Sequence, residues 1–232
     1  MNKELENYKK VQRTAKDTIV YLRKVIKSGM TEREIAGMAE KYMKEHGVPK
    51  FWYYGIGAFV LVGKRTTISI SGREYAPTDE ALQDSDIVSI DLSPEIDSYW
   101  GDFARTLTLE NGVVVGENST NEEFNEGWKV ENALHKEFTR IVKPEMAFQE
   151  VYHLLNKKIT ELGYENLDFN GNLGHSIEKN KDDRKYFEKG EETLLKDVAL
   201  FTFEPHNRKK GGEYGYKREN IYYFECENLE VL

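Results

Sequence analysis

Hydrophobic residues recur at every third or fourth position along residues 5–26, which predicts an amphipathic helix that ends before a glycine. Thr31 follows as the N-cap of a second helix, and Glu34 completes a capping box three residues later. This second helix is expected to end near Gly47. Residues 51–71 then change to aromatic and β-branched runs, which predict strands.

The first half of the chain is expected to finish in a strand–loop–strand unit. Residues 87–92 form an apolar run of strand length, and a second strand is predicted over about residues 99–109. The segment between them, SPEIDS, is rich in turn-forming residues, so we expect a loop there.

The second half repeats this order of elements. Apolar periodicity predicts helices over about residues 121–141 and 148–162, which end before a proline and a glycine respectively. After a polar stretch come a strand over residues 198–204, a glycine-rich loop, and strands over residues 214–224.

The two similar halves, about 1–110 and 120–232, predict an α+β fold in which duplicated helix–helix–strand halves surround a curved, mostly antiparallel sheet. No linker rich in proline, glycine or serine separates the halves. We therefore expect one domain over residues 1–232, with a site in the concave face of its sheet.

Composition narrows the class of protein. A hydrophobic content of 39% in 232 residues is enough for a sizeable core. The formal charge of −8 argues against nucleic acid or an anionic membrane as partner. No apolar run approaches the roughly 20 residues of a membrane span, and Cys226 is the only cysteine. These features predict a cytoplasmic protein.

Acids and one histidine stand at corresponding places of the two halves. The first strand–loop–strand unit carries one aspartate on each arm, and the second carries one glutamate on each arm. The complete candidate set is Asp91, Asp102, His175, Glu204 and Glu219. A buried carboxylate is costly unless a cation compensates it. Oxygen and nitrogen donors of this kind suit two divalent ions of Mn, Co, Zn or Fe, and such a pair can activate water for hydrolysis.

Several segments together resemble the pita-bread metallopeptidases, the family of methionine aminopeptidase, prolidase, aminopeptidase P and creatinase. The segments are GMTEREIAGMAEKYM, DSDIVSIDLSPEIDSYWGDFART, GNLGHSIE, FTFEPH and KRENIYYFECENLEVL. The resemblance implies the pita-bread fold, the five metal ligands, and Glu204 as base for the reacting water. The short spacing from Glu204 to Glu219 is closer to the proline-peptidase branch. The resemblance covers the catalytic domain only.

The chain also departs from the family pattern. Three histidines that bind substrate and move protons in the family are replaced, and the residues at their positions are Glu74–Tyr75, Gly171 and Asp182. Lys217 stands where the family usually has an arginine, which here is shifted to the next position. His206 replaces a glycine, and we interpret it as an alternative proton donor or substrate contact, or else a surface histidine.

Our leading hypothesis is a dinuclear metal-dependent hydrolase of the Xaa-Pro aminopeptidase or dipeptidase type, with Glu204 and His206 as catalytic residues. Its partner would be a short peptide or small amide, and the chain would be a monomer or homodimer. The replaced histidines leave open hydrolysis of a non-peptide amide, or redox chemistry at the metal. A non-catalytic binding module is a third alternative.

Overall fold

The computed structural model describes residues 3–116 and 119–232. Its four α-helices begin and end close to the expected positions. They are α1 (Lys3–Val25), α2 (Glu32–Glu45), α3 (Glu122–Ile141) and α4 (Phe148–Glu161). The capping box of α2 is present, because the Thr31 side chain accepts from the Glu34 amide and the Glu34 side chain accepts from the Thr31 amide.

The strands form four small antiparallel sheets. The first half contributes β1 (Lys50–Phe51), β2 (Ala58–Val62), β3 (Asp86–Leu92), β4 (Pro94–Ile96), β5 (Tyr99–Trp100), β6 (Phe103–Glu110) and β7 (Val113–Val114). The second half contributes β8 (Tyr164–Asn166), β9 (Phe201–Phe203), β10 (His206–Lys209), β11 (Gly215–Lys217), β12 (Asn220–Glu225) and β13 (Asn228–Val231). The strand orders are β2-β3-β6-β7, β1-β4-β5, β11-β10-β8 and β13-β12-β9.

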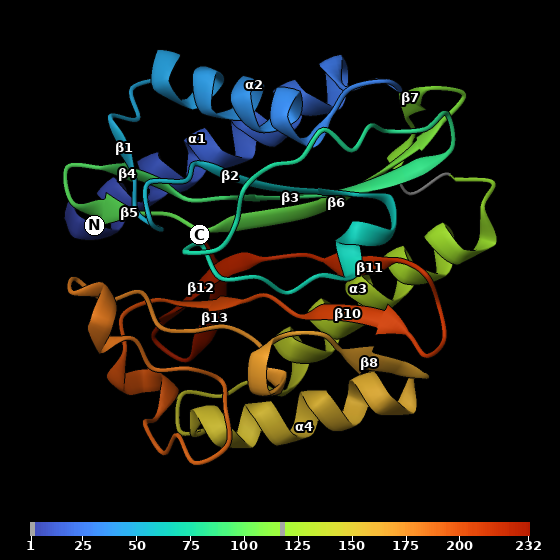
Figure 1. Cartoon of the computed structure of the whole chain (residues 1–232). Helices are drawn as coiled ribbons and strands as arrows, with labels where there is room; N and C mark the ends of the chain where they lie inside the picture. The colour runs from blue at the N-terminus through green and yellow to red at the C-terminus, as the bar shows by residue number, and fades with distance from the viewer. Residues whose placement is uncertain (1–2, 117–118) are drawn as a thin grey trace.

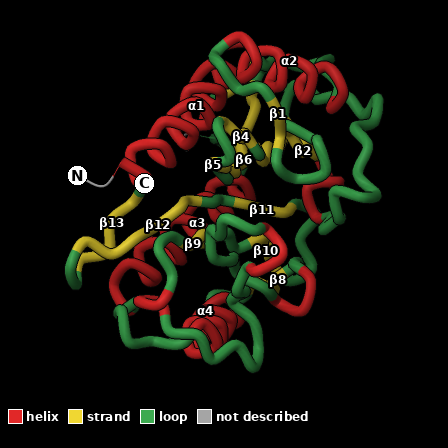
Figure 2. The backbone as a smooth tube through the Cα atoms, turned by 90° about the vertical axis from the view of Figure 1, so that its left-hand side faces the viewer, coloured by secondary structure: helices red, strands yellow, loops and turns green. Residues whose placement is uncertain are grey.

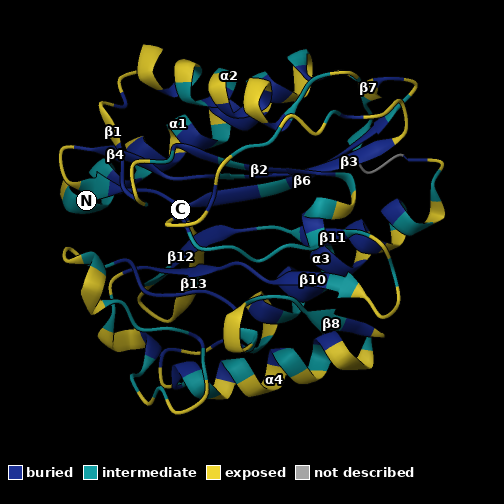
Figure 3. Cartoon of the chain, viewed as in Figure 1, coloured by how far each residue is buried: buried dark blue, intermediate teal, exposed yellow. Residues whose placement is uncertain are grey.

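Helices cover the outside and strands lie between them (Figure 1). Helices α1 and α2 pack on β2, β3 and β6 through one hydrophobic cluster, and α3 and α4 pack on the strands of the second half through another. In Figure 2, α1, α2 and α4 again lie outside the strands, and both ends of the chain lie on the same side. The central strands are buried and the outer helix faces are exposed (Figure 3). This duplicated α+β architecture is the one that the sequence predicts.

The two halves meet where β6 contacts β11 and β12. The Glu219 amide donates to the Ala104 carbonyl over 3.0 Å, and the Lys217 amide donates to Thr106 Oγ1 over 2.8 Å. The Arg105 guanidinium reaches across and donates to the Glu219 carbonyl. These bonds hold the last predicted ligand beside the strand that follows Asp102, so the fold itself brings distant acids together.

Three local predictions are wrong. The sequence predicts a strand over residues 66–70, but Thr66 and Thr67 belong to η1, a 3₁₀ helix over Gly63–Thr67. The reason is local, since the Thr66 and Thr67 hydroxyls donate back to the carbonyls of Gly63 and Lys64. The expected loop over 93–98 contains β4, and the expected glycine-rich loop begins with β10.

In the part of the chain that the structure describes, no helix has the length and apolar character needed to cross a membrane. The division of one domain into halves at about residues 110 and 120 stays a prediction.

Acid should destabilise this fold through His135, which is buried in α3 between the Tyr222 hydroxyl and the Arg218 carbonyl. Burial, followed by the charge of Arg218, lowers the pKa of His135 to about 3. The unfolded chain therefore binds a proton below about pH 6.5 that the native protein does not. The free energy of unfolding should fall as pH drops from about 6.5 toward 3, by at most about 1.4 kcal/mol per pH unit from this group.

Urea denaturation at pH 7, 6 and 5 measures this dependence. The free energy of unfolding should change less steeply with pH in His135→Gln than in the wild type. His153 is exposed, so His153→Gln serves as the control and should keep the wild-type pH dependence. Equal slopes for both variants would show that His135 is not responsible.

Candidate metal centre

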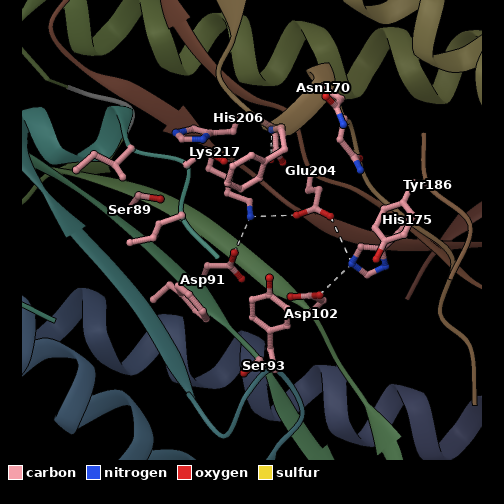
Figure 4. Close-up of a pocket in the computed structure, with 18 of the residues that line it drawn as sticks. Ser89, Asp91, Ser93, Asp102, Asn170, His175, Tyr186, Glu204, His206 and Lys217 are labelled. Carbon is pink, nitrogen blue, oxygen red and sulfur yellow. Dashed lines mark hydrogen bonds and ion pairs between the residues drawn. The ribbon is translucent and has the colours of Figure 1, made fainter. Parts of the chain in front are cut away.

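All five predicted ligands lie at the meeting of the two halves. Asp91 lies near the end of β3, Asp102 just before β6, Glu204 just after β9, and Glu219 just before β12. His175 comes from the segment between α4 and β9, which is anchored because its amide donates to Thr202 Oγ1. A cavity of about 380 Å³ opens beside them, and Asp91, Asp102, His175 and Glu204 line it (Figure 4).

Glu204 connects two subsets of these donors. Oxygen atoms of Asp91, Glu204 and Glu219 lie within 4.8 Å of one another. On the other side of Glu204, His175 Nε2 lies 3.5 Å from Glu204 Oε1 and 3.5 Å from Asp102 Oδ2. The chain therefore offers donor groups for two neighbouring cation positions that share Glu204.

The tautomer of His175 suits a metal ligand. Its Nδ1 lies 3.0 Å from the Ser176 carbonyl oxygen, which can only accept, so Nδ1 carries the proton. In the neutral imidazole, the form that binds a metal, the lone pair is then on Nε2, the atom that faces Asp102 and Glu204. A backbone carbonyl that orients the imidazole in this way is a common feature of histidines that bind metals.

Asp102 is held by the first helix of the chain. Gln12, buried in α1, donates from Nε2 to the Asp102 carbonyl over 2.7 Å and accepts from the Asp102 amide over 3.2 Å. Burial, with the charges of Asp91 and Glu204 acting in the same direction, raises the pKa of Asp102 to about 7. A nearby divalent cation would instead favour the ionised carboxylate.

Glu219 carries the strongest indication of a cation. Its side chain is fully buried, and neither carboxylate oxygen has a hydrogen-bond partner among the described residues. Burial, followed by repulsion from Asp102, Glu204 and Asp91, raises its pKa well above the usual range. By contrast, buried Glu32 accepts from Val62, Arg65 and Thr78. Two orphaned oxygens at the centre of a donor cluster fit a metal ion, which supplies the missing partner.

Lys217 lies inside the cluster, which sequence reasoning did not predict. Its Nζ is 2.6 Å from Asp91 Oδ2 and 3.0 Å from Glu204 Oε2 (Figure 4). Burial opposes the charged form of Lys217, but Asp91, Glu204 and Glu219 outweigh it and raise its pKa well above normal. Burial raises the pKa of Glu204, but the charges of Lys217 and His175 outweigh the effect of burial and leave the pKa lowered.

His206 reaches the cavity wall but is tied to the backbone. Its Nε2 lies 2.7 Å from the Thr66 carbonyl oxygen, so Nε2 carries a proton and donates it there. Burial lowers the pKa of His206 to about 4, which keeps the imidazole neutral near pH 7. Only Nδ1 is then left to accept a proton or a substrate hydrogen bond.

Not all of the residues that replace the family histidines reach the cavity. The Tyr75 hydroxyl instead bonds the backbone of Val60, and Asp182 is exposed in a 3₁₀ turn, η4 (Lys181–Asp183). Tyr186 stands in the cavity wall near His175, with ring centroids 5.8 Å apart. No sequence signal pointed to Tyr186, because it belongs to a polar loop without periodicity.

Aromatic side chains form much of the remaining wall. Trp52, Tyr53 and Phe59 line the cavity, together with Arg184, whose guanidinium lies 5.0 Å from the Trp52 ring. Asp168 also lines it. A cavity with apolar walls and a charged floor fits a small ligand that carries both apolar and polar groups.

Fold and site together define a metal-dependent hydrolase centre built from two similar halves. Residues 6–225 match the model of metallopeptidase family M24. The chain therefore belongs to metallopeptidase family M24 and is a metallopeptidase-like hydrolase. The family that the motifs indicated is confirmed, as is its fold.

The curated relatives include two kinds of peptidase. The chain is 29% identical to a methionine aminopeptidase of Helicobacter pylori over 91% of this chain and 82% of that protein. It is 27% identical to an Xaa-Pro dipeptidase of Pyrococcus furiosus over 87% of this chain. The match covers only 53% of the dipeptidase, so the chain spans about half the length of that relative.

Among solved structures, the prolidase from Pyrococcus horikoshii OT3 superposes with a TM-score of 0.82 at 23% identity. The match covers 100% of this chain and 62% of the prolidase. It shows the shared fold.

Proposed function

We propose that the chain is a dinuclear metal-dependent peptidase that cuts Xaa-Pro bonds near the amino terminus of short peptides. The observation that carries the proposal is that oxygen atoms of Asp91 and Glu204 lie within 4.8 Å of an orphaned oxygen of Glu219, while His175 lies within 3.5 Å of both Glu204 and Asp102. The proline-peptidase assignment is supported by the Xaa-Pro dipeptidase among the relatives and by the short spacing from Glu204 to Glu219.

Asp91, Asp102, His175, Glu204 and Glu219 would hold the two divalent ions. When bound, such ions supply an activated water and polarise the scissile carbonyl. Glu204 is the proposed general base, which accepts the proton of the attacking water at Oε2. Its other oxygen, Oε1, is oriented by the Thr202 hydroxyl, which donates to it over 3.2 Å.

The walls of the cavity are the proposed substrate contacts. His206 offers Nδ1 as an acceptor, whereas its Nε2 remains bonded to Thr66. Trp52 and Phe59 offer apolar surface to a proline ring, and the cavity of about 380 Å³ suits a short peptide. Localisation in the cytoplasm and a monomeric or homodimeric state stay predictions.

The test is hydrolysis by purified protein supplied with Mn²⁺ or Co²⁺. Substrates should include Ala-Pro, Ala-Pro-Ala and Met-Ala-Ser, which separate dipeptidase, aminopeptidase P and methionine aminopeptidase activities. Cleavage before proline, abolished by a chelator and restored by metal, is the expected result. Metal uptake without turnover of any of these peptides would reject the peptidase assignment and direct the search to small non-peptide amides.

A further inference from the structure

The Lys217 ammonium lies within the donor cluster, where a divalent ion would otherwise bind. Its Nζ bridges Asp91 Oδ2 and Glu204 Oε2, two oxygens of the group Asp91, Glu204 and Glu219. An ammonium cannot share these oxygens with a divalent ion at close range, because the two positive charges repel each other strongly in a buried site.

The other cation position has no such competitor. The Asp102 carboxylate and His175 Nε2 face Glu204 Oε1, the oxygen that Lys217 does not contact. Among the described residues, no lysine or arginine side chain forms an ion pair with the carboxylate of Asp102 or Glu219. A first ion can therefore bind beside His175 without moving Lys217.

The backbone of Lys217 cannot move aside easily. Its amide donates to Thr106 Oγ1, the Thr106 hydroxyl donates to its carbonyl over 3.0 Å, and the residue pairs with His206 between β10 and β11. Only the side chain can give way. Asp168 lines the same cavity, and its charge acts on Lys217, so it offers the ammonium a second partner.

We infer that Lys217 is a built-in competitor for the second metal ion, so that the first ion binds beside His175 and the second binds only when the ammonium is displaced. This inference rests on the proposed metal site and refines it. Lys217 acts through the metal ligands and is a positioning residue. It makes the loading of the two ions unequal.

Isothermal titration calorimetry of chelator-treated protein with MnCl₂, supported by native mass spectrometry, measures how many ions bind and how tightly. The wild type should bind one Mn²⁺ with high affinity and a second at least tenfold more weakly. Lys217→Met should bind the second ion at least tenfold more tightly than the wild type does. Lys217→Arg keeps the charge and should retain the wild-type pattern. Lys64→Met, which removes an exposed lysine paired with Glu213, is the matched control.

Lys217→Met leaves Asp91 and Glu204 unpaired until metal binds, so its folding should be checked by circular dichroism in Mn²⁺. The stoichiometry of the wild type tests the inference even if this variant does not fold. Two ions bound with equal affinity by the wild type, or an unchanged second affinity in Lys217→Met, would overturn the inference and leave the proposed function standing. Absence of any Mn²⁺ binding at this site in the wild type would overturn both.

Discussion

Glu204→Gln is expected to lower kcat/KM for an Xaa-Pro peptide by about 10²–10⁴-fold, the range that a positioned general base contributes. The amide keeps the size of the side chain and one oxygen donor, but it cannot accept the proton of the attacking water. Steady-state kinetics in saturating Mn²⁺ measure the fall in kcat/KM. The metal content of the same samples shows whether the variant has lost only its general base or also its metal.

The matched control is Glu213→Gln, an exposed glutamate paired with Lys64. It should retain wild-type kinetics. If Glu204→Gln kept its metal and more than a tenth of the activity, Glu204 would not be the base.

Glu219→Gln should change stability in opposite directions with and without metal. In a chelator at pH 8 the wild type must either bury an ionised Glu219 carboxylate that has no hydrogen-bond partner or keep a proton on it. Its raised pKa means that the native state opposes the ionised form, a penalty that grows as pH rises. The neutral amide removes that charge and can donate to neighbouring carboxylates, so the variant should be more stable by about 1–3 kcal/mol.

In Mn²⁺ the order should reverse. An ion that binds only the native state adds about 2.7 kcal/mol at a hundred times its Kd, and Glu219→Gln should lose most of this gain. Thermal unfolding in chelator and in MnCl₂ measures the stability of the wild type and of Glu219→Gln without and with metal. Glu165→Gln, which removes a partly exposed partner of Arg208 and no predicted ligand, controls for the loss of one acid. Parallel shifts in the wild type and Glu219→Gln would mean that Glu219 binds no metal.

The helices could be predicted from the sequence because their signals are local. Apolar periodicity, the capping pair Thr31 and Glu34, and Gly163 after α4 each act within one or two turns. Strands were less predictable. The run at 66–70 has high β-propensity, but hydroxyl-to-backbone bonds stabilise a 3₁₀ turn there. For β10, one of the two pairing strands, β8, is distant in sequence.

The ligand residues could be named because acids at the ends of apolar strands are rare and costly. Their meeting depends on contacts between the halves, such as the bond from the Glu219 amide to the Ala104 carbonyl, which no local pattern specifies. Lys217 was noticed as a substitution, and its spacing of two from Glu219 could have placed both on one face of an extended chain. The contact between its ammonium and Asp91 depends on the tertiary structure.

The most direct test of the metal site is a crystal structure of the chain with Mn²⁺, with the ion located by anomalous scattering. We predict a strong peak bonded to His175 Nε2 and to carboxylate oxygens of Asp102, Glu204 and Glu219. A protein crystallised in millimolar Mn²⁺ that shows no peak among these residues would contradict it.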